Sequence, residues 1–233
     1  SERGGILRTS DYYTKRWGSE PWGSGFNISL SIGQGELGIT PLQMANVTAI
    51  VANRGYYYKP HLIQAIGANK VIKAEYTKKN SVGVDEKYFG SVIEGMSRVV
   101  NQPTGTAYFS RIPGIEMCGK TGTVQNPHGK DHSVFVAFAP RENPKIAIAV
   151  VVENAGFGST WSAPIASMMV EKFIRDTISR PKAVIEHFMN SNLLPGYEKP
   201  KPVIKKKVDS AAKPKPAEPV KVANNTKAVL KNE

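Results

Sequence analysis

The feature that most constrains this chain is a run of small, polar and cationic residues between apolar ones, Met117 to Gln125 (MCGKTGTVQ). Ile115 lies just ahead of it, and two apolar runs follow, Val134 to Ala139 and Ile146 to Val152. A short extended segment followed by two apolar runs with a turn between them predicts a β-strand beside a β-hairpin. We therefore expect an antiparallel sheet with the lysine segment as one of its strands.

On an edge strand, the alternation of side chains would place Lys120 and Gly122 on one face and Thr121 and Thr123 on the other. Strand twist and the glycines would blur this alternation, so that both hydroxyls could still reach a groove along the edge. The lysine, the two threonines and the glycine between them are thus candidates for a binding site.

The same residues fit a second pattern, G-x-x-x-x-G-K-[ST] from Gly114 to Thr121, which is typical of phosphate-binding loops. That loop needs a strand before it and a helix that begins at its Lys-Thr pair. Ser110 to Pro113 is poor strand material, and Gly122 to Pro127 is poor helix material. We favour the strand and keep a nucleotide-binding domain as the alternative function.

A length of 233 residues allows one domain with a substantial core. The sequence begins at Ser1, without an initiator methionine or an apolar stretch long enough for a signal or a membrane span. We therefore expect a piece of a longer protein. The one cysteine, Cys118, excludes an internal disulfide and a cysteine-based zinc cluster, and we interpret it as a small buried strand residue.

The net charge of +12 is concentrated at the C-terminus, because residues 199–233 contain ten lysines against three acidic residues. The small excess on the rest of the chain does not indicate a nucleic-acid surface. The Lys/Pro-rich composition predicts disorder from about residue 199. We expect a domain over residues 1–180 and a C-terminal extension over residues 181–233.

A third motif lies near the N-terminus. Phe26 to Ile32 alternates apolar and polar residues, which predicts a strand, and Gly33 to Gly38 then reads G-x-G-x-x-G, as in dinucleotide-binding folds. Glu36 inside the loop would repel a pyrophosphate, and no acidic residue follows about twenty positions later to bind a ribose. We interpret the glycines as allowing a close backbone approach beside a cleft.

Helical spacing and capping residues predict three main helices: Pro41 to Ala52, capped by Thr40 and Gln43; Asp85 to about Asn101; and one from about Ser162 to near Arg180. The last should cover the sheet with Ile165, Met169, Phe173 and Ile174. Residues 182–194 could add a short helix. Tyr56 to Tyr58 and residues 62–66 suggest a strand, with a turn at 67–69 and a hairpin to Val71 and Ile72.

His128 and His132 have the spacing of a helical metal pair, but Pro127 and Gly129 prevent a helix there. No third ligand stands out beside the two imidazoles. We expect no metal and no cofactor.

Lys120-Thr121-Gly122 is similar to the K-T-G box of penicillin-recognising serine acyl-transferases. Four stretches together resemble class B penicillin-binding proteins, most of all the penicillin-binding protein 2 group of cell elongation: Ser31–Ala45, Lys59–His61, Gly119–Gln125 and Ala147–Glu153. The resemblance covers about residues 1–175. It implies an α+β fold, with an antiparallel sheet flanked by helices as in β-lactamases and transpeptidases.

The resemblance also implies a serine-type D-Ala-D-Ala transpeptidase that cross-links peptidoglycan stem peptides through an acyl-enzyme and binds β-lactam antibiotics. By similarity, Lys120 supplies positive charge near the peptide carboxylate, and Thr121 and Thr123 hydrogen-bond that carboxylate. The backbone N–H of Thr123 forms half of the oxyanion hole. Gly122 lets the ligand backbone approach the strand.

The same resemblance implies the periplasmic face of the bacterial inner membrane as the location, with an N-terminal anchor outside this sequence. It also implies a membrane glycosyltransferase of the elongation machinery as a partner. It gives no reason to expect a nucleic-acid partner.

The chain departs from the family in two motifs. S-x-N does not occur, and S-x-x-K occurs only at Ser179–Lys182 and Ser210–Lys213, both after the K-T-G box, where the family has its nucleophile well before it. Pro181 interrupts the first of these, and the second lies in the Lys/Pro tail, so we interpret both as accidental. The chain is therefore expected to lack the nucleophile and the first strands and to be inactive alone. A non-catalytic envelope scaffold remains a further alternative.

Overall fold

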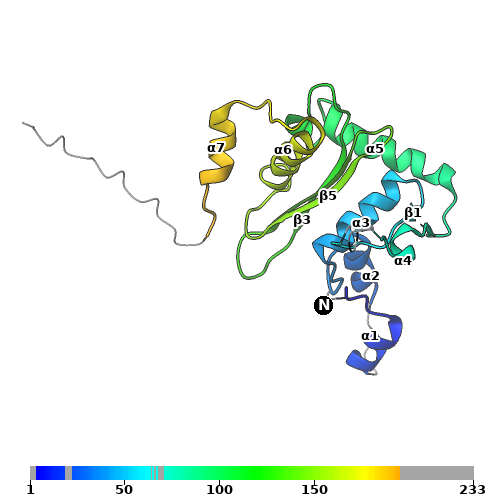
Figure 1. Ribbon diagram of the computed structural model, residues 1–233. Coiled ribbons are helices and arrows are strands. Elements are labelled where there is room, and N and C mark those ends of the chain that lie inside the picture. The colour runs from blue at the N-terminus through cyan, green and yellow to red at the C-terminus, as the bar shows by residue number, and fades with distance from the viewer. Residues whose placement is uncertain (1–3, 19–22, 64, 66, 68–70, 195–233) are drawn as a thin grey trace, which may run out of the picture. The chain divides into compact units, whose positions relative to one another are not determined.

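The computed structural model describes residues 4–18, 23–63, 65, 67 and 71–194. The helices are α1 (Ser10–Trp17), α2 (Ser24–Ser31), α3 (Pro41–Ala52), α4 (Ala74–Thr77), α5 (Phe89–Asn101), α6 (Ser162–Arg175) and α7 (Lys182–Asn190), as Figure 1 shows. The strands are β1 (Tyr56–Tyr57), β2 (Asn80–Ser81), β3 (Cys118–Val124), β4 (His132–Ala139) and β5 (Ile146–Val152). Two 3-10 turns, η1 (Glu86–Tyr88) and η2 (Tyr108–Ser110), complete these elements. The predicted disordered tail lies outside the described residues, and the predicted domain boundary stays a prediction.

The main sheet has the order β3-β4-β5, and both pairings are antiparallel. The lysine segment is the edge strand β3, and the two apolar runs are the hairpin beside it, as predicted. Lys120 pairs with Val136 and Thr121 with Phe135, in the middle of the strand. The phosphate-binding-loop alternative is therefore wrong, because it requires a helix to begin at these two residues.

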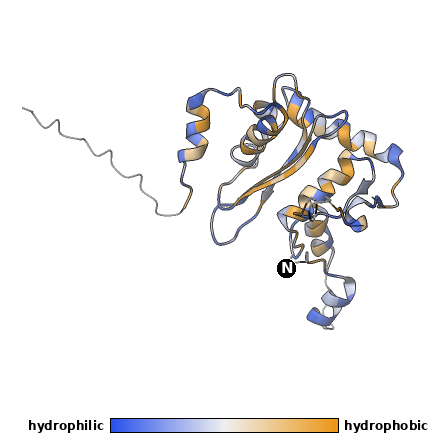
Figure 2. Ribbon diagram, viewed as in Figure 1, coloured by the Kyte–Doolittle hydropathy of each residue, from blue (hydrophilic) through white to orange (hydrophobic). Residues whose placement is uncertain are grey.

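Helices cover both faces of this sheet. On one face, Phe135 and Ala137 of β4 join a buried cluster with residues of α6. On the other face, Cys118 and Phe138 pack with residues of α3 and α5, namely Ala52, Ile93 and Met96. A sheet with two packed faces needs apolar residues at nearly every position, and Figure 2 shows the hairpin strands coloured largely as hydrophobic. The α+β architecture is as predicted.

The residues that α6 turns to the sheet differ from those predicted. Ala163, Ala166 and Val170 are fully buried in the sheet cluster, whereas Met169 is 52% and Phe173 is 62% exposed. Small residues let the helix lie close to the strands, so the larger apolar residues point elsewhere. The prediction was wrong for Ile165, Met169 and Phe173, which line a cavity shared with α7, and right for Ile174, which packs against the cluster.

The strand predicted at Phe26 to Ile32 is also wrong, because these residues belong to α2 and the turn that ends it. Phe26 lies with its ring centroid 5.2 Å from that of Tyr13 and 5.7 Å from that of Trp17, both on α1. Such a short alternation of apolar and polar residues does not distinguish a strand from a helix. Here the segment is helical and packs against α1.

Two helix starts are confirmed. Thr40 Oγ1 accepts a hydrogen bond from the Gln43 backbone N–H, and Gln43 Oε1 accepts one from the Thr40 N–H, which completes the predicted capping box of α3. Asp85 caps η1, which leads directly into α5. The tyrosine strand pairs with β2. Of the hairpin predicted at residues 62–72, residues 64, 66 and 68–70 lie outside the described residues, and no strand is formed by the others.

Candidate active site

Lys120 lies on the exposed edge strand, on the sheet face that α3 and α5 cover. Together with its partner Val136 it lines a cavity of about 430 Å³ between these helices, whose walls are apolar residues such as Val47 and Val92. Its Nζ donates a hydrogen bond to the Thr121 carbonyl at 2.8 Å. A lysine with an exposed side chain therefore lines an apolar cavity, and its amine is held beside the backbone of the edge strand.

Gly122 and Thr123 line a second cavity, of about 490 Å³, next to the first along β3. Its opposite wall is the glycine-rich segment that the sequence analysis placed beside a cleft, residues 32–39. Gly33 and Gly35 have φ angles of 78° and 73°, which only glycine adopts readily. Glu36 of this loop forms an ion pair with Arg16 at 2.8 Å, so a carboxylate lies where a dinucleotide would bring its phosphates.

The side chain of Thr121 lies on a different face of the sheet from that of Lys120. It pairs with Phe135, whose side chain is buried against α6, so Thr121 lies on the opposite face from Lys120. Its hydroxyl oxygen is 3.0 Å from that of Thr106, in the loop that follows α5. The Thr106–Thr121 pair therefore lies at the outer edge of the strand. Sequence reasoning missed Thr106, because a contact between segments fifteen residues apart has no local signal.

Glycines at two positions let other groups approach the site strand closely. A Cβ atom at Gly119 would lie 2.4 Å from Cζ of Phe135. A Cβ atom at Gly158, in the loop before α6, would lie 2.7 Å from the Gly122 carbonyl oxygen and 2.2 Å from that of Val134. The backbone at Gly158 therefore supports β3 and β4 from the α6 side.

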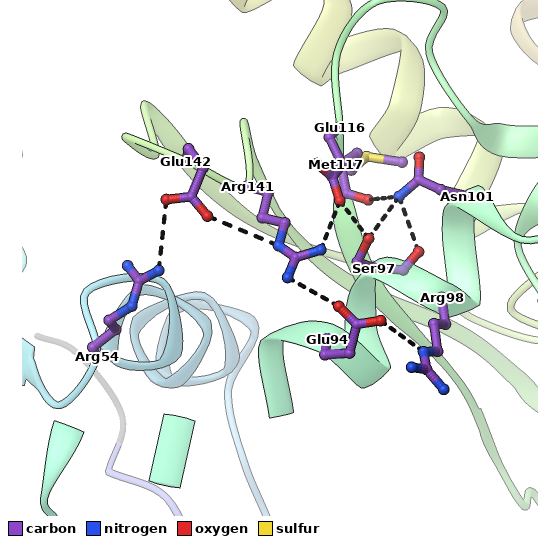
Figure 3. A network of polar contacts seen from close by, with 9 residues as sticks. All are labelled: Arg54, Glu94, Ser97, Arg98, Asn101, Glu116, Met117, Arg141 and Glu142. Carbon is purple, nitrogen blue, oxygen red and sulfur yellow. Dashed lines mark hydrogen bonds and ion pairs between the residues drawn. The ribbon is translucent and has the colours of Figure 1, made fainter. Parts of the chain in front are cut away.

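A polar network holds the start of β3 in place. Figure 3 shows that it joins the turn after α3, helix α5, the β4–β5 turn and the residues just before β3: Arg54, Glu94, Ser97, Asn101, Glu116, Arg141 and Glu142. Arg141 forms ion pairs with Glu94 at 2.9 Å and Glu116 at 3.0 Å, and Asn101 Nδ2 donates to the Met117 carbonyl at 3.0 Å. These contacts fix the position of β3 relative to α5, and thereby that of Lys120 in its cavity.

The network favours the ionised form of its carboxylates. The Ser97 hydroxyl donates to Glu116 at 2.6 Å, and this hydrogen bond, followed by those from Arg141, holds the pKa of Glu116 below its usual range. The Cys118 thiol two residues further on is fully buried, and burial raises its pKa to about 12. Cys118 is therefore a packing residue, as predicted.

The remaining sequence candidates do not form a site. Ser179 donates to Glu171 and lies outside any helix, whereas Lys182 begins α7, so the pair lacks the helical arrangement of S-x-x-K. His128 and His132 lie in and after a loop, and no cluster of three metal-ligating side chains occurs within the described residues. The second S-x-x-K, Ser210 to Lys213, lies outside these residues. None of the helices that the structure describes is both long and apolar enough to cross a membrane.

Comparison with known proteins agrees with this geometry. The sequence model of the penicillin binding protein transpeptidase domain matches residues 6–171. The peptidoglycan D,D-transpeptidase MrdA of Acinetobacter baumannii is 36% identical, over 77% of this chain and 29% of the relative. The chain thus spans less than a third of the length of such curated relatives.

Two solved structures are similar in fold. Pseudomonas aeruginosa PBP2, in complex with WCK 5153, aligns with a TM-score of 0.64 and 32% identity, over 77% of this chain and 39% of that one. Helicobacter pylori PBP2, in a complex with MreC, aligns with a TM-score of 0.61 and 29% identity, over 74% of this chain and 31% of that one. From the matched domain and the strand that carries Lys120, the chain belongs to the penicillin-binding protein transpeptidase family.

Proposed function

We propose that this chain provides the Lys-Thr-Gly wall of a peptidoglycan D,D-transpeptidase, whose nucleophilic serine comes from a segment outside this sequence. The observation that carries the proposal is the position of Lys120 on an edge strand. Lys120 lines one cavity, and Gly122 and Thr123 line the next. A peptide with a terminal carboxylate can bind along such an edge, where charge and backbone donors converge.

The reaction proceeds in two acyl transfers. The serine oxygen attacks the carbonyl of the penultimate D-alanine, its proton passes to the leaving nitrogen, and the terminal D-alanine departs as an amine. An amine of a neighbouring stem peptide then attacks the serine ester, which forms the cross-link and returns the proton to the serine. A β-lactam acylates the same serine by opening its ring.

Each site residue has a role in this scheme. Lys120 attracts the carboxylate and lowers the cost of charge near the serine, while the hydroxyl of Thr123 binds the carboxylate. The hydroxyl of Thr121, beside Thr106 at the outer edge of the strand, reaches the carboxylate around this edge. The backbone N–H of Thr123 donates to the oxyanion of the tetrahedral intermediate, which contributes about 3 kcal/mol to the transition state. Gly122 carries no side chain that would keep the peptide from the strand.

The apolar cavity between α3 and α5 supports a place for the missing nucleophile. Val47 is 56% and Val92 is 49% exposed, so these valines offer apolar surface that a further element would bury. A helix seated there would bring its serine to the Lys120 end of the cavity. The complete domain would then contain both halves of the catalytic machinery.

We propose that the complete protein acts on the periplasmic face of the bacterial inner membrane, beside a membrane glycosyltransferase that supplies the glycan strands. The name of the relatives, peptidoglycan D,D-transpeptidase, supports the location, because peptidoglycan is a polymer of the cell wall. Cross-linking in intact cells at a residue of α7, followed by identification of the captured protein, tests the partner. Capture of cytoplasmic proteins alone would contradict the location.

The central test compares two lysines in the complete transpeptidase, in which the nucleophile-bearing segment is joined to this chain. Lys120→Ala should lower the rate of acylation by fluorescent penicillin about 100-fold, because it removes the charge that binds the carboxylate. Lys145→Ala, in the exposed β4–β5 turn, is the matched control and should leave the rate within twofold. Equal rates for the two variants would refute the role of Lys120.

The chain by itself should form no covalent adduct with fluorescent penicillin, since the described serines include none placed like the family nucleophile. The complete transpeptidase serves as the positive control in the same gel. Stoichiometric labelling of the chain alone would show that one of its own serines is the nucleophile.

A further inference from the structure

His132, the first residue of β4, is a residue that the proposed mechanism does not use. It pairs with Val124 at the end of β3 and lines the same cavity as Gly122 and Thr123. Its ring is partly exposed, and most of its neighbours in that cavity are apolar, such as Val134 and Val151. A polar ring in an apolar wall beside the proposed peptide site can select what binds there.

The hydrogen bonding of His132 determines which ring nitrogen carries the proton. Its Nδ1 lies 3.0 Å from the backbone nitrogen of Asn154, which can only donate. Nδ1 must therefore accept, and in a neutral imidazole the proton is then on Nε2. Within the part of the chain that the structure describes, the Nε2–H group has no hydrogen-bond acceptor. The ring of this cavity-lining residue is left with one donor that has no partner among the described residues.

Two loops hold the Asn154 N–H in position. Asn154 has a φ angle of 56°, and its side-chain oxygen accepts a hydrogen bond from Asn126 at 2.6 Å. Gly156 donates to the Asp131 carbonyl at 2.7 Å, and the Asp131 carboxylate accepts from the Asn126 backbone N–H. The loop before β4 and the loop after β5 are thus joined beside His132, and the ring orientation is set by backbone groups rather than by flexible side chains.

The charges of Lys120 and His132 indicate which kind of acceptor each can bind. Lys120, four residues along β3 from Val124, is about 13 Å away along the strand and suits a carboxylate. The cavity around the His132 ring is mostly apolar, so an uncharged acceptor can satisfy its N–H without bringing a charge into these surroundings. An amide carbonyl of a peptide bound along Gly122 to Val124 provides such an acceptor.

We propose that His132 is a specificity-determining residue, whose Nε2–H donates to an amide carbonyl of the stem peptide, upstream of the reacting D-alanine. This inference rests on the proposed function, since it assumes that a peptide lies along β3. It adds a second group of the substrate that the site recognises, an amide carbonyl upstream of the terminal carboxylate. A small β-lactam that lacks this part of the peptide does not make the contact.

Two substitutions in the complete transpeptidase test the roles of Nδ1 and Nε2 of His132 separately. His132→Asn keeps an oxygen near Nδ1 that can accept from Asn154, but has no group at the Nε2 position. His132→Gln places an amide N–H near the Nε2 position but has no acceptor for Asn154. His128→Asn, at an exposed histidine of the loop before β4 that lines no part of this cavity, is the matched control.

With a full-length stem peptide, His132→Asn should lower kcat/KM about tenfold, the effect of losing one hydrogen bond, while penicillin acylation stays within twofold. His132→Gln and His128→Asn should retain the stem-peptide rate within threefold. A His132→Asn enzyme with an unchanged stem-peptide rate would overturn the inference and leave the proposed function intact. A wild-type enzyme that no penicillin acylates would overturn the proposed function itself.

A second measurement does not depend on activity. In the complete protein labelled with ¹⁵N-histidine, long-range proton–nitrogen spectra at pH 8 should show His132 as the Nε2–H tautomer, assigned by its loss in His132→Asn. The Nδ1–H tautomer, or a mixture of both, would overturn the inference. Addition of the stem peptide should shift the Nε2 resonance, and the absence of a shift at saturation would overturn it as well.

Discussion

Gly119→Ala tests how tightly the site strand is packed. The added Cβ would lie 2.4 Å from Cζ of Phe135 and 3.0 Å from the Val136 carbonyl oxygen, whereas unstrained carbon contacts are about 3.5–4.0 Å. Phe135 has no exposed surface and is enclosed by the cluster beneath α6, so its ring cannot move by the required ångström. Overpacking of this kind costs about 3 kcal/mol, at the upper end of the usual range.

The assay is urea unfolding of the chain, followed by circular dichroism at 222 nm. With a slope of about 2 kcal/mol per molar urea, a loss of about 3 kcal/mol lowers the midpoint by about 1.5 M. Gly90→Ala is the matched control, since a Cβ there meets no atom within 4 Å and alanine favours the helix, so the midpoint should rise slightly.

The double variant Gly119→Ala/Phe135→Leu identifies the cause of the destabilisation. Leucine lacks the Cζ atom, so the two substitutions should be coupled by about 1 kcal/mol or more rather than additive. If Gly119→Ala shifted the midpoint no more than Gly90→Ala, or if the double variant were additive, the steric argument would be refuted.

Three further expectations concern the segment around the start of β3. Cys118 should react with a thiol reagent at pH 8 only as fast as the chain unfolds, because with a pKa of about 12 only about 10⁻⁴ of the thiol is ionised. Rapid labelling of the folded chain would contradict the burial of this thiol. Asn101→Ala should cost about 1–2 kcal/mol in urea unfolding, because it leaves the Met117 carbonyl without its amide donor. Ser97→Ala should raise the pKa of Glu116 towards its usual value, measured by NMR titration of the carboxyl carbon. Because the pKa of Glu116 is lowered in the folded wild type, the wild type should be more stable than this variant at pH 7. The difference should be less than about 1 kcal/mol, because Glu116 is half exposed. It should vanish as the pH falls through the pKa of Glu116 in the folded state.

The parts of the fold with strong local signals could be predicted from the sequence. The capping box of α3, the Asp85 cap before α5, and the β4–β5 hairpin each depend on residues only a few positions apart. The strand that carries Lys120 was predictable because Gly122 to Pro127 is poor helix material and two apolar runs follow it. In each case neighbouring residues in the sequence are also neighbours in space.

The errors come from elements whose conformation or orientation depends on distant contacts. The apolar stripe of α6 suggested that Met169 and Phe173 face the sheet, but the fully buried residues in the sheet cluster are the smaller Ala163, Ala166 and Val170. Helical spacing shows which residues share a face, but it does not tell which of two apolar faces meets the sheet. The choice depends on the space that β4 and β5 leave, and this is not visible in the helix sequence.

The same distinction between local sequence signals and distant contacts applies to the site. The K-T-G motif identified the strand, yet what surrounds it depends on tertiary contacts: the Glu116 network, the approach of Gly158 to Gly122, and the Asn154 donor that orients His132. Two of the glycines at the site meet packed atoms of β4, so they serve packing as well as substrate access. A substitution at Gly158 would therefore act on the site through the position of β3, without touching the substrate. For this reason, activity lost at either glycine is evidence about chemistry only when the unfolding midpoint is unchanged.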